Sequence, residues 1–201
     1  MTLSKCADGA WQSPGFTDIQ VNGFAGADYN SPRTTLEEIA RSLRALFSTG
    51  VTQLLPTVIT GSPKDMLGAL TNLARARREL PEGKAIAGFH VEGPHISSDD
   101  GPRGAHPLRW VRPPDLGEYR RWQDATGGQI KLVTLAPEWP EAPRYVEALV
   151  RDGVTVSIGH TGASRWGMPM RLSEWPTKRY PPGASMSVSR STRCVREGTS
   201  K

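Results

Sequence analysis

Residues 34–58, TTLEEIARSLRALFSTGVTQLLPTV, place a helical pattern directly before a strand pattern. In the first part, apolar residues recur at the spacing of one helical face. Thr35 and Glu38 have the spacing of a capping box, and Gly50 stands where a helix should end. The run TQLLPTV (52–58) that follows is short and apolar, as is typical of a buried strand. This stretch therefore predicts a helix followed by a strand.

The same alternation extends over residues 16–164. Further helices are predicted over 62–80, where Pro63 suits the first turn, over 140–153 and, with weaker marking, near 115–125. The predicted strands are FTDIQV (16–21), TQLLPTV (52–58), AIAGFHV (85–91), IKLVTLA (130–136) and VTVSIG (154–159). Strands that alternate with helices indicate βαβ units and a parallel sheet, so the fold class is α/β.

About five such units are predicted, whereas a closed (β/α)8 barrel needs eight units and roughly 250 residues. The chain has 201 residues, so it fits either a partial (β/α)8 TIM barrel or an open doubly wound sheet. The glycines of QVNGFAGADYN, residues 20–30, lack the spacing of a dinucleotide-binding or phosphate-binding loop. The open nucleotide-binding sheet is therefore the weaker alternative.

The formal net charge of +5 invites a nucleic-acid-binding interpretation. The excess of basic residues, however, lies in residues 165–201, which hold eight Lys/Arg against two acids. That segment carries no nucleic-acid-binding motif, so we expect no nucleic-acid partner. We also expect no membrane association, because the chain lacks a secretory signal and an apolar run of roughly 18 residues. Cys6 and Cys194 have no paired spacing, which fits a reducing cytoplasm.

Residues 165–201 differ from the rest of the chain. They are rich in Arg, Ser, Pro and Trp and show neither helical nor strand periodicity, although a sixth βα unit is due there. One interpretation is a disordered basic tail. The other, which we favour, is out-of-frame translation, because the change comes where a helix should follow a strand.

Polar side chains recur where the predicted strands end, which is the edge that carries the reactive groups in a parallel α/β barrel. They are Gln20 and Asn22 around the end of the first strand, Thr57 and Thr60 around the end of the second, Glu92, His95 and His106 after the third, Glu138 after the fourth and His160 after the fifth. A carboxylate and an imidazole from different strands are the usual ligands of a catalytic divalent ion.

Each of these residues also has a simpler interpretation. His160 alone could be an ordinary hydrogen-bonding histidine, and Glu92 could cap the Gly-Pro turn that follows it. His90 alternates with Glu92 on the same strand face, so it is either a residue that orients a metal ligand or a core residue, and we favour the core residue. His95 could be merely exposed in a loop. The coincidence of Glu92 and His160 at one edge is what favours a metal site.

Four segments together, PGFTDIQVNGFAG, HVEGPHIS with GAH, VTLAPE and VSIGHTGAS, resemble the N-acetylglucosamine-6-phosphate deacetylases of the amidohydrolase superfamily. The resemblance covers roughly residues 14–164. It implies a barrel of the metal-dependent amidohydrolase type, a partial one here. It also implies the hydrolysis of N-acetyl-D-glucosamine 6-phosphate to D-glucosamine 6-phosphate and acetate, with a small-molecule amino-sugar phosphate as the partner.

The resemblance assigns roles to particular residues. Glu92 and His160 match metal ligands, and Ala105 and His106 match positions that contact the sugar. Gln20 and Asn22 stand where many amidohydrolases carry a His-x-His pair, which implies a single divalent ion near these amides. Zinc and iron both suit such ligands. Glu138 matches a family motif, but no chemical step is assigned to it.

The chain departs from the family pattern, and we expect a truncated form. Residues 1–15 match only a remnant of the N-terminal β-sandwich region, residues 16–164 form the partial barrel, and 165–201 are the irregular tail. A second histidine ligand and the aspartate base of the family have no counterpart, so no catalytic base is assigned. Two protein ligands hold an ion poorly, so we expect weak activity or none. The family is typically a homodimer.

Two further functions stay open. One is an amidohydrolase that acts on a cyclic amide or on another acetylated sugar. The other is a non-catalytic fragment that is unstable or serves as an interaction module. Turnover of N-acetylglucosamine 6-phosphate by a complete version of the protein separates the first alternative from the deacetylase. Soluble expression with a cooperative thermal transition would separate a retained fold from an unstable fragment.

Overall fold

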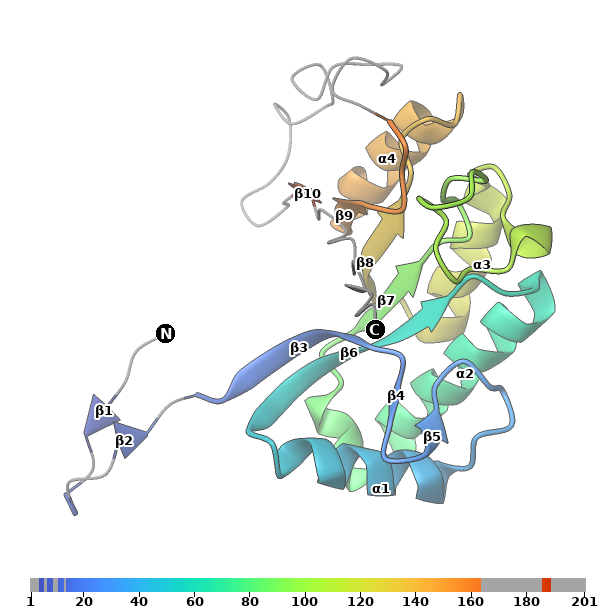
Figure 1. Ribbon diagram of the computed structural model, residues 1–201. Helices are drawn as coiled ribbons and strands as arrows, with labels where there is room; N and C mark the ends of the chain where they lie inside the picture. The colour runs from blue at the N-terminus through green and yellow to red at the C-terminus, as the bar shows by residue number, and fades with distance from the viewer. Residues whose placement is uncertain (1–3, 6, 9–10, 13, 164–185, 189–201) are drawn as a thin grey trace, which may run out of the picture.

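A parallel sheet of six strands organises the chain, and four helices lie on one side of it (Figure 1). The computed structural model describes residues 4–5, 7–8, 11–12, 14–163 and 186–188. The sheet strands are β3 (Phe16–Val21), β6 (Val51–Ile59), β7 (Phe89–Glu92), β8 (Ile130–Leu135), β9 (Thr155–Ile158) and β10 (Met186–Val188). The helices are α1 (Leu36–Phe47), α2 (Pro63–Glu79), α3 (Leu116–Thr126) and α4 (Ala142–Arg151).

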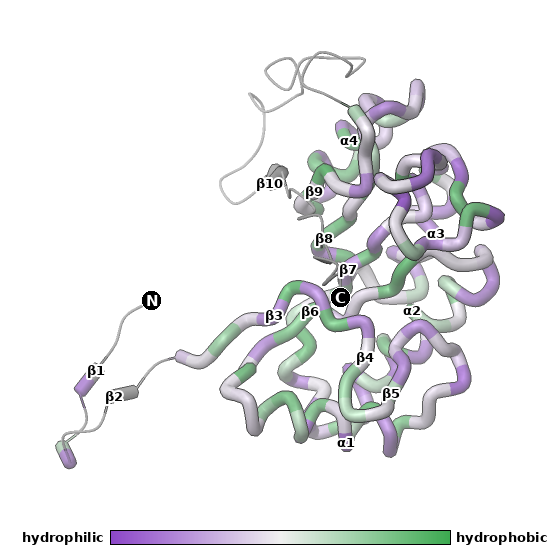
Figure 2. Tube along the Cα trace, viewed as in Figure 1, coloured by the Kyte–Doolittle hydropathy of each residue, from purple (hydrophilic) through white to green (hydrophobic). Residues whose placement is uncertain are grey.

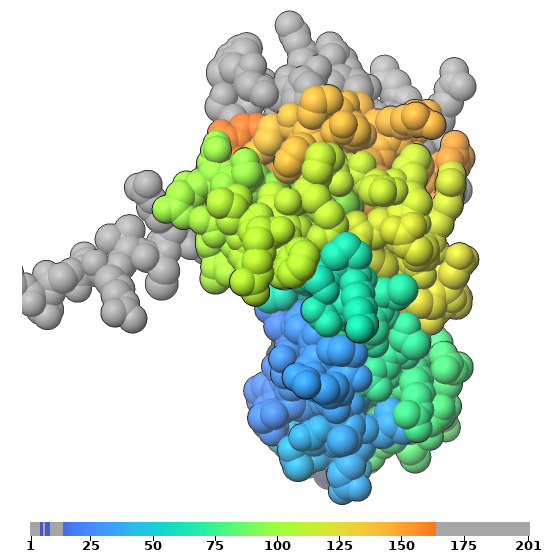
Figure 3. All heavy atoms as spheres, turned by 90° about the vertical axis from the view of Figure 1, so that its right-hand side faces the viewer, coloured from blue at the N-terminus to red at the C-terminus, as the bar shows by residue number. Residues whose placement is uncertain are grey.

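The strand order across the sheet is β10-β9-β8-β7-β6-β3, and every neighbouring pair is parallel. Each strand of this sheet therefore lies beside the sheet strand that comes before it along the chain, as in a barrel that is built up one βα unit at a time. Figure 3, which looks at the molecule from the side of the helices, shows the consequence: the colours run in chain order from blue to orange. The prediction of a partial (β/α)8 barrel is confirmed.

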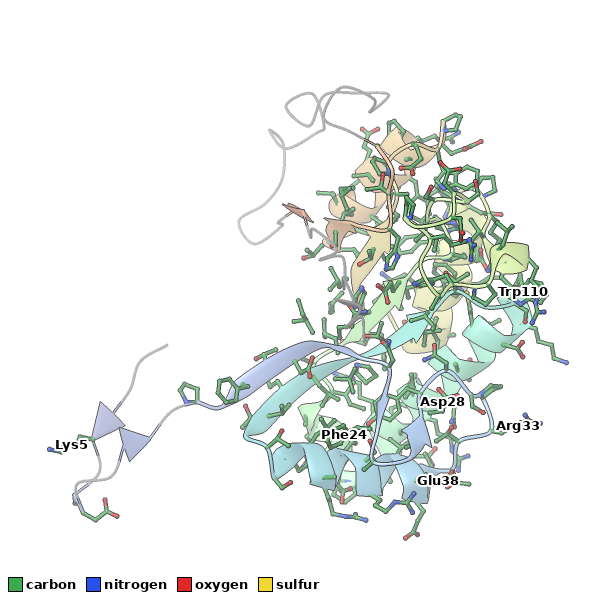
Figure 4. The ribbon with its side chains drawn as sticks, viewed as in Figure 1. Lys5, Phe24, Asp28, Arg33, Glu38 and Trp110 are labelled. Carbon is green, nitrogen blue, oxygen red and sulfur yellow. The ribbon has the colours of Figure 1, made fainter. Side chains whose placement is uncertain are left out.

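The shorter elements lie outside this sheet. Two antiparallel pairs are formed by β1 (Ser4–Lys5) with β2 (Trp11–Gln12) and by β4 (Gly23–Phe24) with β5 (Ala27–Asp28). The 3-10 helices are η1 (Pro81–Ala85) and η2 (Leu108–Trp110). Both β4 and β5 contact α1, and Figure 4 shows Phe24 and Asp28 on this hairpin above the helix that carries Glu38.

The main core lies between the sheet and the helices. Alternate residues of the central strands enter it, for example Phe89 and Val91 of β7 and Val133 of β8, and all three are fully buried. From the helix side, Ile39 of α1 and Leu70 of α2 are equally buried. Figure 2 shows the matching change between hydrophobic and hydrophilic residues along α1. Burial of this apolar face stabilises the α/β layers.

The predicted N-terminal caps of α1 and α2 are confirmed. Thr35 accepts a hydrogen bond from the backbone N–H of Glu38, whose carboxylate accepts the N–H of Thr35 in return, so the capping box is complete. Ser62 caps α2, with Pro63 in its first turn. The weakly marked helix near 115–125 is α3, and Asp115 caps it.

One predicted strand begins too early. AIAGFHV was predicted as a strand over 85–91, but Ala85 ends the 3-10 helix η1 and β7 begins only at Phe89. Between them, Ile86 makes a single parallel bridge to Leu54. A Cβ atom at Gly88 would lie 2.3 Å from Cγ of Lys131. The main chain therefore passes too close to β8 at this point for a residue with a side chain.

The prediction of five βα units is confirmed for five strands, β3 and β6 to β9, and for four helices. Within 165–201, where no strand was predicted, the structure describes Met186–Val188 alone, as a short parallel strand beside β9. The rest of the predicted irregular tail lies outside the described residues. No helix in the described ranges combines the length and apolar character that a membrane crossing requires.

Candidate metal centre

Glu92 is the last residue of β7 and is almost fully buried. Its register partners are Ile59 on β6 and Thr134 on β8, so it lies at the C-terminal edge of the sheet. The chain turns directly after it, at Gly93, with a φ of +77° that suits glycine. A Cβ atom there would lie 2.2 Å from Oγ1 of Thr60. The turn after Glu92 therefore requires glycine for two independent reasons.

His160 brings an imidazole to the same edge from β9. Its Nε2 atom lies 2.9 Å from Oε1 of Glu92. Its other ring nitrogen, Nδ1, lies 3.1 Å from the carbonyl oxygen of Pro102, which can only accept a hydrogen bond. The backbone of His160 has a φ of +51°, and its carbonyl accepts the N–H of Ser97 at 2.9 Å. The loop after β7 thus holds both the ring and the main chain of His160.

His106 is the third member of the group. Its Nδ1 atom lies 2.8 Å from Oγ1 of Thr60, and its ring stands edge-on to that of His160 with centroids 4.5 Å apart. One ligand atom from each of Glu92, His106 and His160 lies within 4.8 Å of the other two. One carboxylate oxygen and two imidazole nitrogens form a donor set that catalytic zinc sites use. The chemistry of these donors fits one divalent ion.

The charges of Glu92 and His160 stabilise each other. The hydrogen bond to Glu92 raises the pKa of His160, which outweighs the effect of burial. Burial raises the pKa of Glu92, but the hydrogen bond and positive charge of His160 outweigh it, so the carboxyl pKa lies below its ordinary value. Burial and the charge of His160 lower the pKa of His106. A cation that bound between these residues would replace the proton shared by Glu92 and His160.

The first-strand amides lie in different environments. Nε2 of Gln20 donates a hydrogen bond to Oε2 of Glu92 at 2.7 Å, so this amide orients the carboxylate. The backbone carbonyl of Asn22 accepts hydrogen bonds from the N–H of Tyr29 and from Nδ2 of Asn30, and Asn22 is exposed. The expectation that both amides lie near a metal is thus supported by the geometry for Gln20 alone. Ala105 is exposed beside His106.

His90 joins strands beneath the candidate metal centre. Its Nδ1 donates to the carbonyl of Ile19 at 3.0 Å, which leaves Nε2 to accept from Oγ1 of Thr134 at 2.8 Å. Thr57 also lies 3.3 Å from Nδ1. The three partners belong to β3, β8 and β6, which agrees with the interpretation of His90 as a core residue.

His95 is fully buried, so the interpretation of a solvent-exposed loop histidine is wrong. The residue packs on the outer side of the sheet, with its ring 5.0 Å from that of Tyr145 and 5.9 Å from that of Trp122. Its Nδ1 lies 3.2 Å from the carbonyl oxygen of Arg112. The Gly-Pro turn carries the chain across the sheet edge, which places His95 among the helices.

Comparison with known proteins adds a family resemblance to this geometry. No protein-family model matches the chain. The chain is 36% identical over 154 residues to N-acetylglucosamine-6-phosphate deacetylase of Bacillus subtilis, and 38% identical over 163 residues to that of Caenorhabditis elegans. These alignments cover 75% and 78% of the chain. The chain resembles the N-acetylglucosamine-6-phosphate deacetylases.

Solved structures agree with this resemblance. A crystal structure of the deacetylase from Mycobacterium smegmatis matches with a TM-score of 0.67 at 36% identity, over 75% of this chain and 41% of that chain. A mutant of that enzyme was solved in complex with N-acetyl-D-glucosamine-6-phosphate. The deacetylase of Pasteurella multocida matches with a TM-score of 0.58 at 29% identity. The chain spans about 38% of the length of the curated deacetylases it matches.

Sequence patterns alone could not reveal every contact that shapes this deacetylase-like site. Thr60 was noted only as a polar residue at a strand end, yet it orients His106. The carbonyl of Pro102 and the N–H of Ser97 hold His160, but backbone groups leave no signal in the residue types. Glu138 accepts hydrogen bonds from Thr161 and from the N–H of Gly162. These contacts depend on how loops from different strands meet.

Proposed function

We propose that the chain is the metal-binding part of a hydrolase that removes the acetyl group of N-acetyl-D-glucosamine 6-phosphate. The observation that carries this proposal is the distance of 2.9 Å between Oε1 of Glu92 and Nε2 of His160, on a chain that resembles deacetylases. Carboxylates and imidazoles brought together at the strand ends of an α/β barrel are typical of metal-dependent hydrolysis.

We propose Glu92 and His160 as ligands of one zinc or iron ion. Each already has a second contact that fixes its orientation: Gln20 donates to the free oxygen of Glu92, and the carbonyl of Pro102 accepts from the free nitrogen of His160. Such outer contacts set the tautomer and direction of metal ligands. When bound, the ion would polarise an amide carbonyl and activate water.

His106 has two possible roles in this proposal. Thr60 engages its Nδ1 atom, so Nε2 is left to face the other two ligand groups. Catalytic zinc sites usually take three protein ligands, which favours His106 as the third. The resemblance instead places His106, with Ala105, against the sugar. A His106→Gln variant separates the two roles, because a ligand role predicts weaker zinc binding and a sugar contact predicts weaker substrate binding alone.

Zinc titration of the full chain against a competing chelator tests the metal centre. We expect one zinc ion per chain, and a loss of affinity of about 100-fold or more in Glu92→Ala and in His160→Ala, since ligand loss should exceed the 10- to 100-fold effect of outer contacts. Glu147→Ala on the exposed side of α4 is the matched control and should bind zinc as the unaltered chain does. Equal zinc affinity in all four proteins would overturn the proposal.

The substrate is tested separately on the zinc-loaded chain. We expect N-acetyl-D-glucosamine 6-phosphate to bind more tightly than D-glucosamine 6-phosphate, which lacks the acetamide. Preferential binding of a dihydropyrimidine would favour the cyclic-amide alternative, and binding of neither compound would favour a non-catalytic fragment. We further propose a cytoplasmic location, because Cys6 and Cys194 show no disulfide spacing.

A further inference from the structure

Glu138 holds the loop that follows His160. The residue lies shortly after β8, and its carboxylate is half-buried. Its Oε2 atom accepts a hydrogen bond from Oγ1 of Thr161 at 2.5 Å, and its Oε1 atom accepts the backbone N–H of Gly162 at 3.3 Å. Thr161 also accepts the N–H of Ala163 at 2.9 Å. One carboxylate therefore engages both residues that directly follow the candidate metal ligand.

The main chain of His160 needs such support. Its φ of +51° lies in the left-handed region, which is unfavourable for a residue with a side chain. Residues in this region persist where the surrounding structure determines them from several sides. The loop after β7 supplies two contacts, the N–H of Ser97 to the carbonyl and the carbonyl of Pro102 to the ring. Glu138 supplies the contacts on the C-terminal side.

We propose that Glu138, acting through Thr161, is a positioning residue that fixes the direction of the His160 imidazole toward Glu92. The inference rests on the proposed function, because it adds a third support of His160, after the contacts of Ser97 and Pro102, to the proposed metal centre. Glu138 is not part of the group whose ligand atoms lie within 4.8 Å of one another. Its role is to link the end of β8 to the end of β9, so that two neighbouring strand ends keep their ligand geometry.

Zinc affinity of loop variants tests this role. Glu138→Ala should weaken zinc binding roughly 10- to 100-fold, the usual effect of losing a group that orients a metal ligand. Thr161→Val, which keeps the side-chain shape but loses the hydroxyl, should show a similar loss, and Thr161→Ser should restore the affinity. Glu141→Ala is the matched control, because Glu141 is exposed and its side chain caps no backbone group of α4.

Amide hydrogen exchange of the metal-free chain gives an independent readout. The N–H of Ser97 donates to the carbonyl of His160, so we expect it to exchange faster in Glu138→Ala and Thr161→Val and at an unchanged rate in Glu141→Ala. If the unaltered chain bound no zinc, the proposed function would fail while this exchange experiment still tested the positioning role. Unchanged Ser97 exchange in both variants would overturn the inference, and Thr161→Val keeps the test valid if Glu138→Ala does not fold.

Discussion

The two faces of the sheet differ in chemistry although the same strands form both. On the outer face, beneath the helices, the strands contribute apolar residues to the core: Leu54, Val58, Phe89, Val91, Val133, Leu135, Val156 and Ile158. The alternate positions on the inner face include buried polar residues: Thr57, His90, Glu92, Thr134 and Ser157. Successive strand residues point to opposite faces, so one sequence pattern encodes two different surfaces.

This difference separates stability from function. The outer face buries apolar area, which stabilises the fold in proportion to that area. The inner face buries polar groups, and each needs a hydrogen-bond partner to avoid a cost of about 1–3 kcal/mol. Those partners, such as Ile19 and Thr134 for His90, also fix the side chains that surround Glu92. We therefore expect outer-face changes to alter stability most, and inner-face changes to alter the metal centre as well.

The largest effect is expected on the outer face, at Trp122 of α3. This side chain is almost completely buried against His95. Trp122→Ala should lower the free energy of unfolding by about 3–5 kcal/mol, the usual cost of emptying a large aromatic site. Urea denaturation measures this loss in the free energy of unfolding. Trp110→Ala is the matched control, because Trp110 is only half-buried, and loss of its cation–π contact with Arg109 should cost about 1 kcal/mol. Equal losses of stability in the two variants would contradict this prediction.

The next effect concerns pH and the one histidine on the outer face. Burial lowers the pKa of His95 from 6.5 to about 4. The unfolded chain takes up this proton between those values, so the stability from a neutral His95 is complete above pH 6.5 and is lost as the pH falls toward 4. The loss approaches about 1.4 kcal/mol per pH unit, or about 3 kcal/mol across the window.

Denaturation of the chain and of His95→Gln at several pH values between 7.5 and 5 measures this effect. The free energy of unfolding of the variant should depend less on pH, because the variant lacks the buried imidazole. Subtracting one pH profile from the other removes the contributions of the other histidines. The charged residues that face His95 are Asp115, Glu118 and Arg112. They are present in both proteins, so the two proteins differ only in the imidazole. Parallel pH profiles of the two proteins would contradict the assignment.

A smaller effect on stability is expected on the inner face, at His90. His90→Leu keeps much of the volume but leaves the Ile19 carbonyl and the Thr134 hydroxyl without this partner. We expect a loss of about 1–3 kcal/mol in the free energy of unfolding. Zinc affinity should fall as well, because Glu92 lies two residues further on the same strand. A stability loss without any change in zinc affinity would show that the two faces are less distinct than proposed.

The outer face accounts for most of what could be predicted from the sequence. Periodicity and capping residues are local signals, so the strand over 16–21 and the helix that begins after Thr35 were located correctly. The start of β7 at Phe89 was missed, and Gly88, inside the predicted strand, lies close to Lys131 of the next strand. Local patterns cannot report such contacts.

The site was predictable to the extent that strand ends meet at one edge. That rule brought Glu92 and His160 together, which the structure places 2.9 Å apart. It could not distinguish Gln20, whose side chain reaches Glu92 from within β3, from Asn22, which follows β3 and is exposed. Nor could it place His95, since a Gly-Pro turn gives no sign of the face to which it leads.

The smallest effect is expected at Thr35, where the helix that covers the outer face begins. Thr35→Ala removes the acceptor for the N–H of Glu38 and should cost about 1 kcal/mol. Thr35→Ser keeps the hydroxyl and should retain most of the stability. Zinc affinity should be unchanged in both variants, because the cap lies at the helix layer. A measurable loss of zinc affinity in Thr35→Ala would mean that the outer layer also controls the strand ends, and the separation between the faces would then have to be abandoned.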